Sequence, residues 1–540
     1  MKKLIALLLV LVTLCTVSLA AFTDQKDITK TYVTAVEAMA EAKIIGGFED
    51  GSFRPKESLT RAQAAKIICT MLGAENETAA PAGFTDVPAG HWAEKFINYC
   101  AEKQIVAGIG SGKFDPNGQL KGSQWAKMLL VAYGHDAAEL TGDSWFANTQ
   151  QAVKNKGLDK DAHLSDTTTT REKACQLAYN FYEKYTFLKS LPEGYAEESI
   201  DMVKEETLYK SYGRMYAADA GLAINWPGSG VEFEAECAGD MFMTYTAEES
   251  GYFQIFVDGQ TGLRVRTTTG KNRTVTVAED LAPGKHNIRI IRDHDTSSKG
   301  LKFELTSVNF IGKKETVKAA ADKKLLIEFV GDSITSGKGA IVEYLEKDQI
   351  YGEGCHSGTV SYAYLASQLL DADWTMLSRG SAGYFQTSTS CPKTVEGLYP
   401  YYNGLMKDPI PYTATRQADV AVLALCTNDS TSTMEKAVAA GTTSYKDMEG
   451  AVKWLMEAVR KNHGKDVKIV LLYGMMTSNN AWEPTFKAIA DADPNVFALR
   501  TTRNNDGGRS KVTSVGHPSA AAHKVVAQEL ADFLKNEVLK

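Results

Sequence analysis

The chain has 540 residues, enough for about three or four domains of ordinary size and too many for one compact domain. Apolar residues make up 44% and charged residues 23% of it, close to the averages of soluble globular proteins, so a disordered, collagen-like or fibrous chain is excluded. Acidic residues outnumber basic ones by 66 to 59, which gives a formal net charge of −7. This acidic balance argues against nucleic acid as a partner.

The N-terminus has the pattern of a cleaved secretory signal peptide. Two lysines precede an unbroken apolar run at 4–14, and small residues follow at Ser18 and Ala20. We therefore expect residues 1–20 to be removed and the protein to be exported. No later segment approaches the roughly 18 apolar residues that a membrane-spanning helix needs, so we expect no membrane span.

The next region contains one unit three times, at about 21–78, 79–137 and 138–187. Each unit predicts an amphipathic helix, a Gly-rich turn with an aromatic residue, and a second helix, which a Thr caps in the segments TRAQ and TREK. The openings FTDQ and FTDV mark the first two units, and the third is the least regular. The pattern resembles the S-layer homology (SLH) domain, a small α-helical repeat that occurs in triplets.

This resemblance implies binding to pyruvylated secondary cell-wall polysaccharide, and hence a place at the cell wall or S-layer of a Gram-positive-type envelope. Arg61 and Arg171 could grip a carboxylate with the guanidinium fork, and Gly47 lies in a turn whose backbone N–H groups could approach a sugar acid. In the second unit KGSQ at 121–124 replaces the expected tetrapeptide, so we expect a weakened pocket there. For each arginine, pairing with an acidic residue on a neighbouring helix is an equally weighted alternative.

An antiparallel β-sandwich is expected at 211–315, after an acidic segment at 188–210 that predicts a linker or one short helix. Short alternating segments are separated there by Gly, Asp-Gly and Pro-Gly turns. The phrases WPGSGVEFE, FVDG and LAPGKHNIRIIR resemble the N-terminal jelly roll of the family-two carbohydrate esterases.

Four polar residues near the end of this region raise the question of a metal site, namely His286, Asp293, His294 and Asp295. Their side chains suit a cation, but such spacing is more typical of a solvated turn, which is the interpretation we favour. We therefore predict no metal ligands.

Residues 322–540 predict a three-layer α/β domain with a parallel sheet. Continuous apolar strands such as LLIEFVG and VKIVLLYG alternate with amphipathic helices, which cover both faces of such a sheet. Functional residues should lie where the strands end, at their carboxyl edge.

In the segment 327–340 a strand ends in Gly-Asp-Ser, which places Ser333 at the strand tip with a helix N-terminus expected next. The motif IEFVGDSITSGKGA resembles block I of the SGNH (GDSL-type) hydrolases, whose serine is the nucleophile. In the second block, LSRGSAGYF, the family implies that Gly383 gives an N–H to the oxyanion, while Gly380 serves a tight turn. In the third, ALCTNDS, it implies the Asn428 amide as a further donor, although Cys426 replaces the family's glycine.

The general base that the resemblance implies is His517, in the segment SVGHPS ahead of the terminal helix. His523 is expected on the surface of that helix. Relatives usually carry an Asp three residues before the base, where this chain has Ser514. A backbone carbonyl can replace that acid in some family-two esterases, and Asp506 is another candidate to orient the imidazole.

Together these resemblances imply a cell-surface serine esterase that uses two-step acyl transfer and needs no metal or cofactor. The implied substrate is an O-acetylated plant polysaccharide such as xylan or mannan. Two alternatives stay open: deacetylation of the organism's own wall glycan, and a degenerate domain with a structural or glycan-binding role.

Overall fold

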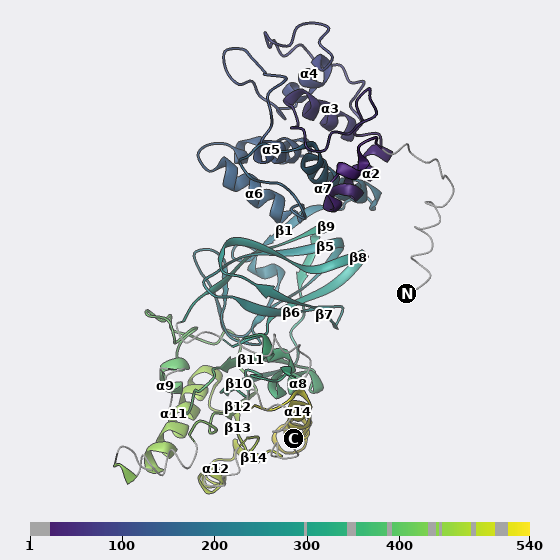
Figure 1. Ribbon diagram of the computed structural model, residues 1–540. Helices are drawn as coiled ribbons and strands as arrows, with labels where there is room; N and C mark the ends of the chain where they lie inside the picture. The colour runs from purple at the N-terminus through teal and green to yellow at the C-terminus, as the bar shows by residue number, and fades with distance from the viewer. Residues whose placement is uncertain are drawn as a thin grey trace, which may run out of the picture. The chain divides into compact units, whose positions relative to one another are not determined.

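The structure is a computed structural model, shown as a ribbon in Figure 1. It describes residues 22–295, 300–342, 353–385, 391, 393–429, 439–441, 445–476, 482–502 and 517–540, and the expected signal peptide lies outside these ranges. Two compact units make up the chain, Met1–Glu193 and Gly194–Lys540. Among the described residues, no helix is both long and apolar enough to cross a bilayer.

From residue 22 onward, the first unit consists of three successive helix pairs around one core. Its helices are α2 (Val33–Glu41), α3 (Arg61–Met71), α4 (Glu94–Glu102), α5 (Gly122–Ala132), α6 (Trp145–Asn155) and α7 (Arg171–Ser190), with short 3-10 turns at Gln25–Asp27, Lys30–Tyr32 and Ala137–Leu140. The second helix of each pair packs on the first helix of the next pair, α3 on α4 and α5 on α6, while α7 returns to α2. The three repeats therefore close on one another, and each junction joins two of them.

The predicted caps differ among the repeats. Thr60 accepts a hydrogen bond from the Gln63 backbone N–H, and the Gln63 side chain accepts one from the Thr60 N–H, which together form a capping box. Lys121 holds the corresponding place in the second repeat, where the Gln124 side chain still accepts its N–H. The expectation fails for Thr170, which precedes α7 without a side-chain capping bond.

The second unit begins with a β-sandwich that contains three long antiparallel strands, β5, β8 and β9. Its strands are β1 (Ala196–Asp201), β2 (Lys210–Tyr212), β3 (Met215–Ala217), β4 (Leu222–Ile224), β5 (Gly230–Ala247), β6 (Gly251–Val257), β7 (Gln260–Thr267), β8 (Gly270–Arg292) and β9 (Phe303–Ala319), with a 3-10 turn at Glu206–Leu208. β5 pairs with β8 on one side and β9 on the other, all antiparallel. The segment 188–210, expected as a linker, contains β1, which joins the sheet beside β9.

The rest of the second unit is a three-layer α/β fold. Its parallel strands are β10 (Leu325–Gly331), β11 (Ala372–Ser378), β12 (Val420–Ala424), β13 (Lys468–Tyr473) and β14 (Val496–Arg500), in the order β11-β10-β12-β13-β14. Its helices are α8 (Tyr362–Leu369), α9 (Val395–Leu398), α11 (Tyr445–His463), α12 (Trp482–Asp491) and α14 (Ala520–Phe533), followed by a π-helical turn at Leu534–Val538, and 3-10 turns lie at Glu353–Cys355 and Gly358–Val360. Figure 1 shows α8 and α14 on one face of the sheet and α9 and α11 on the other.

The order of the strands locates the functional edge. The sequence order of the strands reverses at β10, which lies between β11 and β12, and ligands of such sheets bind beyond the carboxyl ends at this switch point. Successive side chains of β10, β11 and β12 point to opposite faces of the sheet, and an apolar core covers each face. These three strands are therefore almost fully buried.

Buried polar contacts join the sandwich to the α/β fold. The Arg214 guanidinium pairs with the Glu328 carboxylate of β10 at 3.0 Å, and both side chains are fully buried. The Tyr399 hydroxyl donates to the same carboxylate at 2.7 Å, and His463 Nε2 lies 3.0 Å from it. Burial by itself opposes ionisation, but the hydrogen bond from His463 and the charge of Arg214 lower the pKa of Glu328 to about 2.

Candidate active site and a pocket in the helical unit

Ser333 lies two residues beyond the end of β10, at the carboxyl edge of the sheet. The turn needs a glycine at Gly331, because a Cβ there would overlap the Thr335 hydroxyl. Asp332 fixes the turn by accepting a hydrogen bond from the Ile334 N–H at 2.9 Å. Consecutive turns, rather than the helix expected from the sequence, then carry the chain onward to Ala340.

His517 faces Ser333 from the other end of the domain's sequence. Its Nε2 lies 2.8 Å from the Ser333 Oγ, within the reach that proton transfer requires. It stands just ahead of α14, whose N-terminus is capped by Ser519 through the Ala522 N–H. Asp506 and Ser514, predicted to orient the imidazole, lie outside the described residues.

Asn428 follows β12 and lies beside the turn that contains Gly383. Its side-chain Nδ2 donates to the Ala382 carbonyl at 2.7 Å and to the Asp332 carboxylate at 3.3 Å. The neighbouring Asp429 carboxylate accepts from the backbone N–H of Tyr384 at 2.7 Å. The structure therefore brings Ser333, His517, Asn428 and the turn of Gly383 to one edge of the sheet.

Cys426 occupies its position without backbone strain. It is not among the residues with positive φ, so the family's glycine is not needed there for its conformational freedom. Its thiol is buried, and burial raises its pKa well above the ordinary value. Cys426 is therefore a packed, protonated thiol rather than a competing nucleophile.

Asp332 directly precedes the proposed nucleophile and is fully buried. Burial raises the pKa of its carboxyl to about 7, the charges of Asp429 and Asp295 act in the same direction, and the bonds from Ile334 and Thr427 oppose the shift. Near neutral pH the site thus holds this carboxyl partly in its neutral form.

Two further expectations from the sequence are wrong. His523 is buried rather than exposed, and its Nδ1 accepts the Tyr362 backbone N–H at 3.1 Å. Its spacing to Val526 and Leu530, three and seven residues on, places it on the apolar face of α14 and is the feature that could have predicted this.

The second error concerns Asp293, His294 and Asp295, which are buried and do not form a solvated turn. His294 Nδ1 accepts the Tyr252 N–H at 3.1 Å, and both aspartates bond to the α/β fold. His286 lies apart from them, paired with Asp258 at 2.9 Å. In the part of the chain that the structure describes, no group of three or more His, Cys, Asp and Glu side chains could hold a metal ion.

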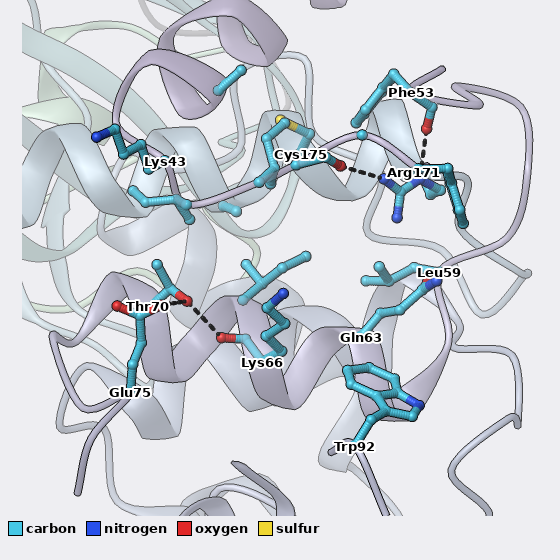
Figure 2. A pocket seen from close by; sticks show the side chains of 18 residues that line it. Lys43, Phe53, Leu59, Gln63, Lys66, Thr70, Glu75, Trp92, Arg171 and Cys175 are labelled. Carbon is cyan, nitrogen blue, oxygen red and sulfur yellow. Dashed lines mark hydrogen bonds between the residues drawn. The ribbon is translucent and has the colours of Figure 1, made fainter. Parts of the chain in front are cut away.

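A pocket of about 470 Å³ lies in the helical unit, at the junction between the first and third repeats. Figure 2 shows Lys43 and Arg171 on one wall, and Lys66, Gln63 and Trp92 on the other. Three lining side chains are cationic, and one, Glu75, is acidic. Trp92 is 55% exposed, and such an indole offers a sugar ring a flat surface. The predicted Gly47 also lines this pocket.

Among the described residues, the two predicted arginines bond to backbone carbonyls and to no acidic side chain. Arg171 donates to the carbonyls of Phe53 at 2.8 Å and Gly46 at 3.2 Å, as Figure 2 shows in part. Arg61 makes the equivalent bonds to Phe114 and Ala107 at the next junction. Each arginine thus ties the second helix of one repeat to the Gly-rich turn of another, which the alternative of pairing with neighbouring acids did not foresee.

Comparison with known proteins identifies the parts of the chain. Residues 21–65 and 83–126 match the S-layer homology domain, and residues 211–314 match the carbohydrate esterase 2 N-terminal domain. The chain is 37% identical over 117 residues to a cell surface protein of Thermoanaerobacter kivui, a match that covers 21% of this chain and 15% of that protein. It is 26% identical over 328 residues to the cellulase/esterase CelE of Acetivibrio thermocellus, covering 58% of this chain and 37% of the relative.

Solved structures of carbohydrate esterases share the fold of a large part of the chain. A family two carbohydrate esterase from Cellvibrio japonicus aligns with a TM-score of 0.54 and 16% identity, over 64% of this chain and 100% of that one. The acetyl xylan esterase Est2A of Butyrivibrio proteoclasticus aligns with a TM-score of 0.53 and 17% identity, over 64% and 99%. At these identities the likeness establishes the fold.

Proposed function

We propose that this chain, which joins S-layer homology domains to the fold of the family two carbohydrate esterases, is a cell-surface serine esterase that removes O-acetyl groups from polysaccharide. The observation that carries the proposal is the 2.8 Å approach of His517 Nε2 to the Ser333 hydroxyl at the carboxyl edge of β10. Nucleophile and base within hydrogen-bond reach are what acyl transfer requires.

The proposed reaction has two steps. His517 Nε2 takes the proton of Ser333 while the serine oxygen attacks the acetyl carbonyl, and the proton then passes to the sugar oxygen that leaves. Water, activated by the same imidazole, attacks the acetyl-serine, releases acetate and restores the hydroxyl. The Ser333 N–H, the Gly383 N–H and the Asn428 amide are proposed to hold the oxyanion in both steps. A carbonyl near Ser514, or Asp506, is proposed to receive the other imidazole N–H.

Acetylated hemicellulose such as xylan or mannan is the substrate we favour. The support is the likeness of the second unit to an acetyl xylan esterase and to other family two carbohydrate esterases. The strain-free place of Cys426 further favours an intact catalytic loop over a degenerate one. The acetyl groups of the organism's own wall glycan are the alternative substrate.

The helical unit is proposed to bind secondary cell-wall polysaccharide. The S-layer homology domains support a location at the cell wall surface. The pocket with Lys43, Lys66 and Arg171 fits an anionic sugar such as a pyruvylated one, because its cations exceed its acids. Arg171 already donates to two carbonyls through Nε and one Nη. Lys43 and Lys66 are therefore proposed to make most of the contacts with the anionic group.

Acetate release tests the proposal. Wild type and Ser333→Ala are compared on acetylated xylan, acetylated glucomannan and isolated peptidoglycan. Release from a plant polysaccharide by wild type alone is the expected result. Release from peptidoglycan alone would move the role to wall remodelling, and no release from any of them by folded protein would contradict the enzymatic function.

A further inference from the structure

The end of β8 carries a run of charged and polar residues, 292–295, that is buried although it reads RDHD. This run belongs to the β-sandwich, yet its carboxylates bond to the α/β fold. Burying a charge is costly unless hydrogen bonds and opposite charges compensate it. The contacts of Asp293 and Asp295 therefore indicate which parts of the α/β fold this run holds in place.

Asp293 holds one loop of the α/β fold. Its Oδ1 accepts from the Ser357 hydroxyl at 2.9 Å and from the Thr359 N–H and hydroxyl at 3.0 and 2.7 Å. Its Oδ2 accepts from Arg264 Nε of β7 at 2.7 Å, and Arg264 also donates to the His356 carbonyl. The loop is thus tied to the sandwich from two sides.

Asp295 holds the turn beside the nucleophile. Its Oδ2 accepts from the Gly380 backbone N–H at 2.8 Å and from Arg379 Nη1 at 2.7 Å. A Cβ built on Gly380 would lie 2.8 Å from this oxygen and 3.8 Å from the Ser333 Cβ. Gly380 therefore lies close to both the sandwich carboxylate and the proposed nucleophile, and a side chain at this position would crowd the Asp295 oxygen.

The turn is anchored at both ends. Asp295 fixes its beginning at Gly380, and Asp429 fixes its end through the N–H groups of Tyr384 at 2.7 Å and Phe385 at 3.3 Å. Between them, Asn428 donates to the Ala382 carbonyl. Because the Gly380 N–H is committed to Asp295, the oxyanion donor must come from further along the turn, which agrees with the proposed role of Gly383.

We propose that Asp295, a residue of the β-sandwich, is a positioning residue of the active site that holds the oxyanion turn 380–383 against Ser333. The expected effect on kcat rests on the proposed esterase function, whereas the effect of Asp295 on the position of the turn does not. The sandwich is then a working part of the active site and not an appended module. Loss of the Asp295 carboxylate leaves the Gly380 N–H and the Arg379 charge without this acceptor, and the turn relaxes.

The test compares Asp295→Ala and the milder Asp295→Asn with Glu279→Gln, an exposed carboxylate-to-amide control on the same sandwich. In the full-length protein, kcat for acetyl ester hydrolysis should fall about 10- to 100-fold in Asp295→Ala, with KM nearly unchanged. A misplaced oxyanion donor still gives part of the transition-state stabilisation that is lost completely when a donor is deleted. Asp295→Asn, which keeps the size of the side chain, should lose less, and the control should match wild type.

Hydrogen–deuterium exchange gives a readout that needs no activity. Peptides covering 379–385 should exchange about tenfold faster or more in Asp295→Ala, while peptides of β13 and α14 stay unchanged. Unchanged exchange in 379–385 overturns the proposal whatever the activity, and faster exchange with an unchanged kcat overturns the catalytic consequence. If wild type hydrolyses no acetyl ester, the proposed function fails, and exchange alone decides whether Asp295 holds the turn. Should Asp295→Ala not fold, Asp295→Asn carries the same comparison.

Discussion

Replacement of Asn428 by alanine tests the proposed oxyanion site most directly. The side chain is already held in place, since its Nδ2 donates to the Ala382 carbonyl at 2.7 Å, and the longer bond to Asp332 at 3.3 Å is the one that the substrate oxygen would replace. A preorganised donor costs little reorganisation when charge develops on the substrate oxygen. Deleting one such donor lowers kcat by about 100- to 1000-fold, or roughly 2.7–4 kcal/mol of transition-state stabilisation.

Steady-state hydrolysis of p-nitrophenyl acetate, checked by acetate release from polysaccharide, measures this effect. KM should change little, because the interaction forms in the transition state and not with bound substrate. Asn495→Ala is the matched control, since Asn495 precedes β14 at the opposite edge of the same sheet and bonds to Lys468. A fall in kcat of less than about tenfold in folded Asn428→Ala, or a loss borne by KM, would refute the role of this amide in the oxyanion site.

Three further predictions concern stability and anchoring. Arg214→Met should cost about 3–5 kcal/mol of unfolding free energy in urea titrations, because it leaves the buried Glu328 carboxylate without its cation, and adding Glu328→Gln should recover part of the loss. The folded wild type holds the Asp332 proton up to about pH 7, whereas the unfolded chain releases it near pH 4, so wild type loses stability between these pH values. Asp332→Asn should not show this loss, and its unfolding free energy should therefore rise relative to wild type by up to about 4 kcal/mol from pH 4 to 7. Lys66→Ala and Trp92→Ala should each reduce co-sedimentation of the full chain with purified walls severalfold. Unchanged co-sedimentation would show that this pocket does not bind the wall polysaccharide.

The core of the candidate site could be predicted from the sequence because each residue stands at a recognisable boundary. Ser333 and Asn428 follow apolar strands that the parallel sheet buries, and His517 precedes the last amphipathic helix. Parallel strands bring their carboxyl ends together whatever their separation in the chain. Local periodicity therefore predicted where the strands and the helix end, and the resemblance to the SGNH hydrolases supplied the roles of these three residues.

The contribution of Asp295 could not be predicted in the same way. Its partners, Arg379 and Gly380, lie 84 and 85 residues further on and in another domain. Nothing in a local pattern of charges distinguishes a solvated turn from a segment buried between two domains. The one available feature was that RDHD follows an apolar strand directly, with no glycine or proline to turn the chain into solvent.

The prediction of a linker at 188–210 and the alternative of acidic partners for Arg61 and Arg171 were wrong for related reasons. The strand β1 is acidic and mostly exposed, with Ile200 as its one buried residue, so its alternation is too weak to predict a strand. Arg61 and Arg171 have the expected place at the junctions of repeats, but residue type alone does not tell whether a guanidinium bonds to a carboxylate or to carbonyls.

Three buried carboxyls of the described residues lie around the active-site turn, and the pKa of one of them, Asp332, is raised. Asp295 accepts from the Arg379 guanidinium and Asp429 from two backbone N–H groups, while Asp332 is fully buried and near enough to both to feel their charges. Its pKa is consequently raised to about 7, because burial and the charges of the other two both favour the neutral form. A neutral Asp332 next to Asn428 spares the developing oxyanion from a nearby negative charge. Ionisation of Asp332 should therefore lower kcat above about pH 7, and this loss should disappear in Asp332→Asn.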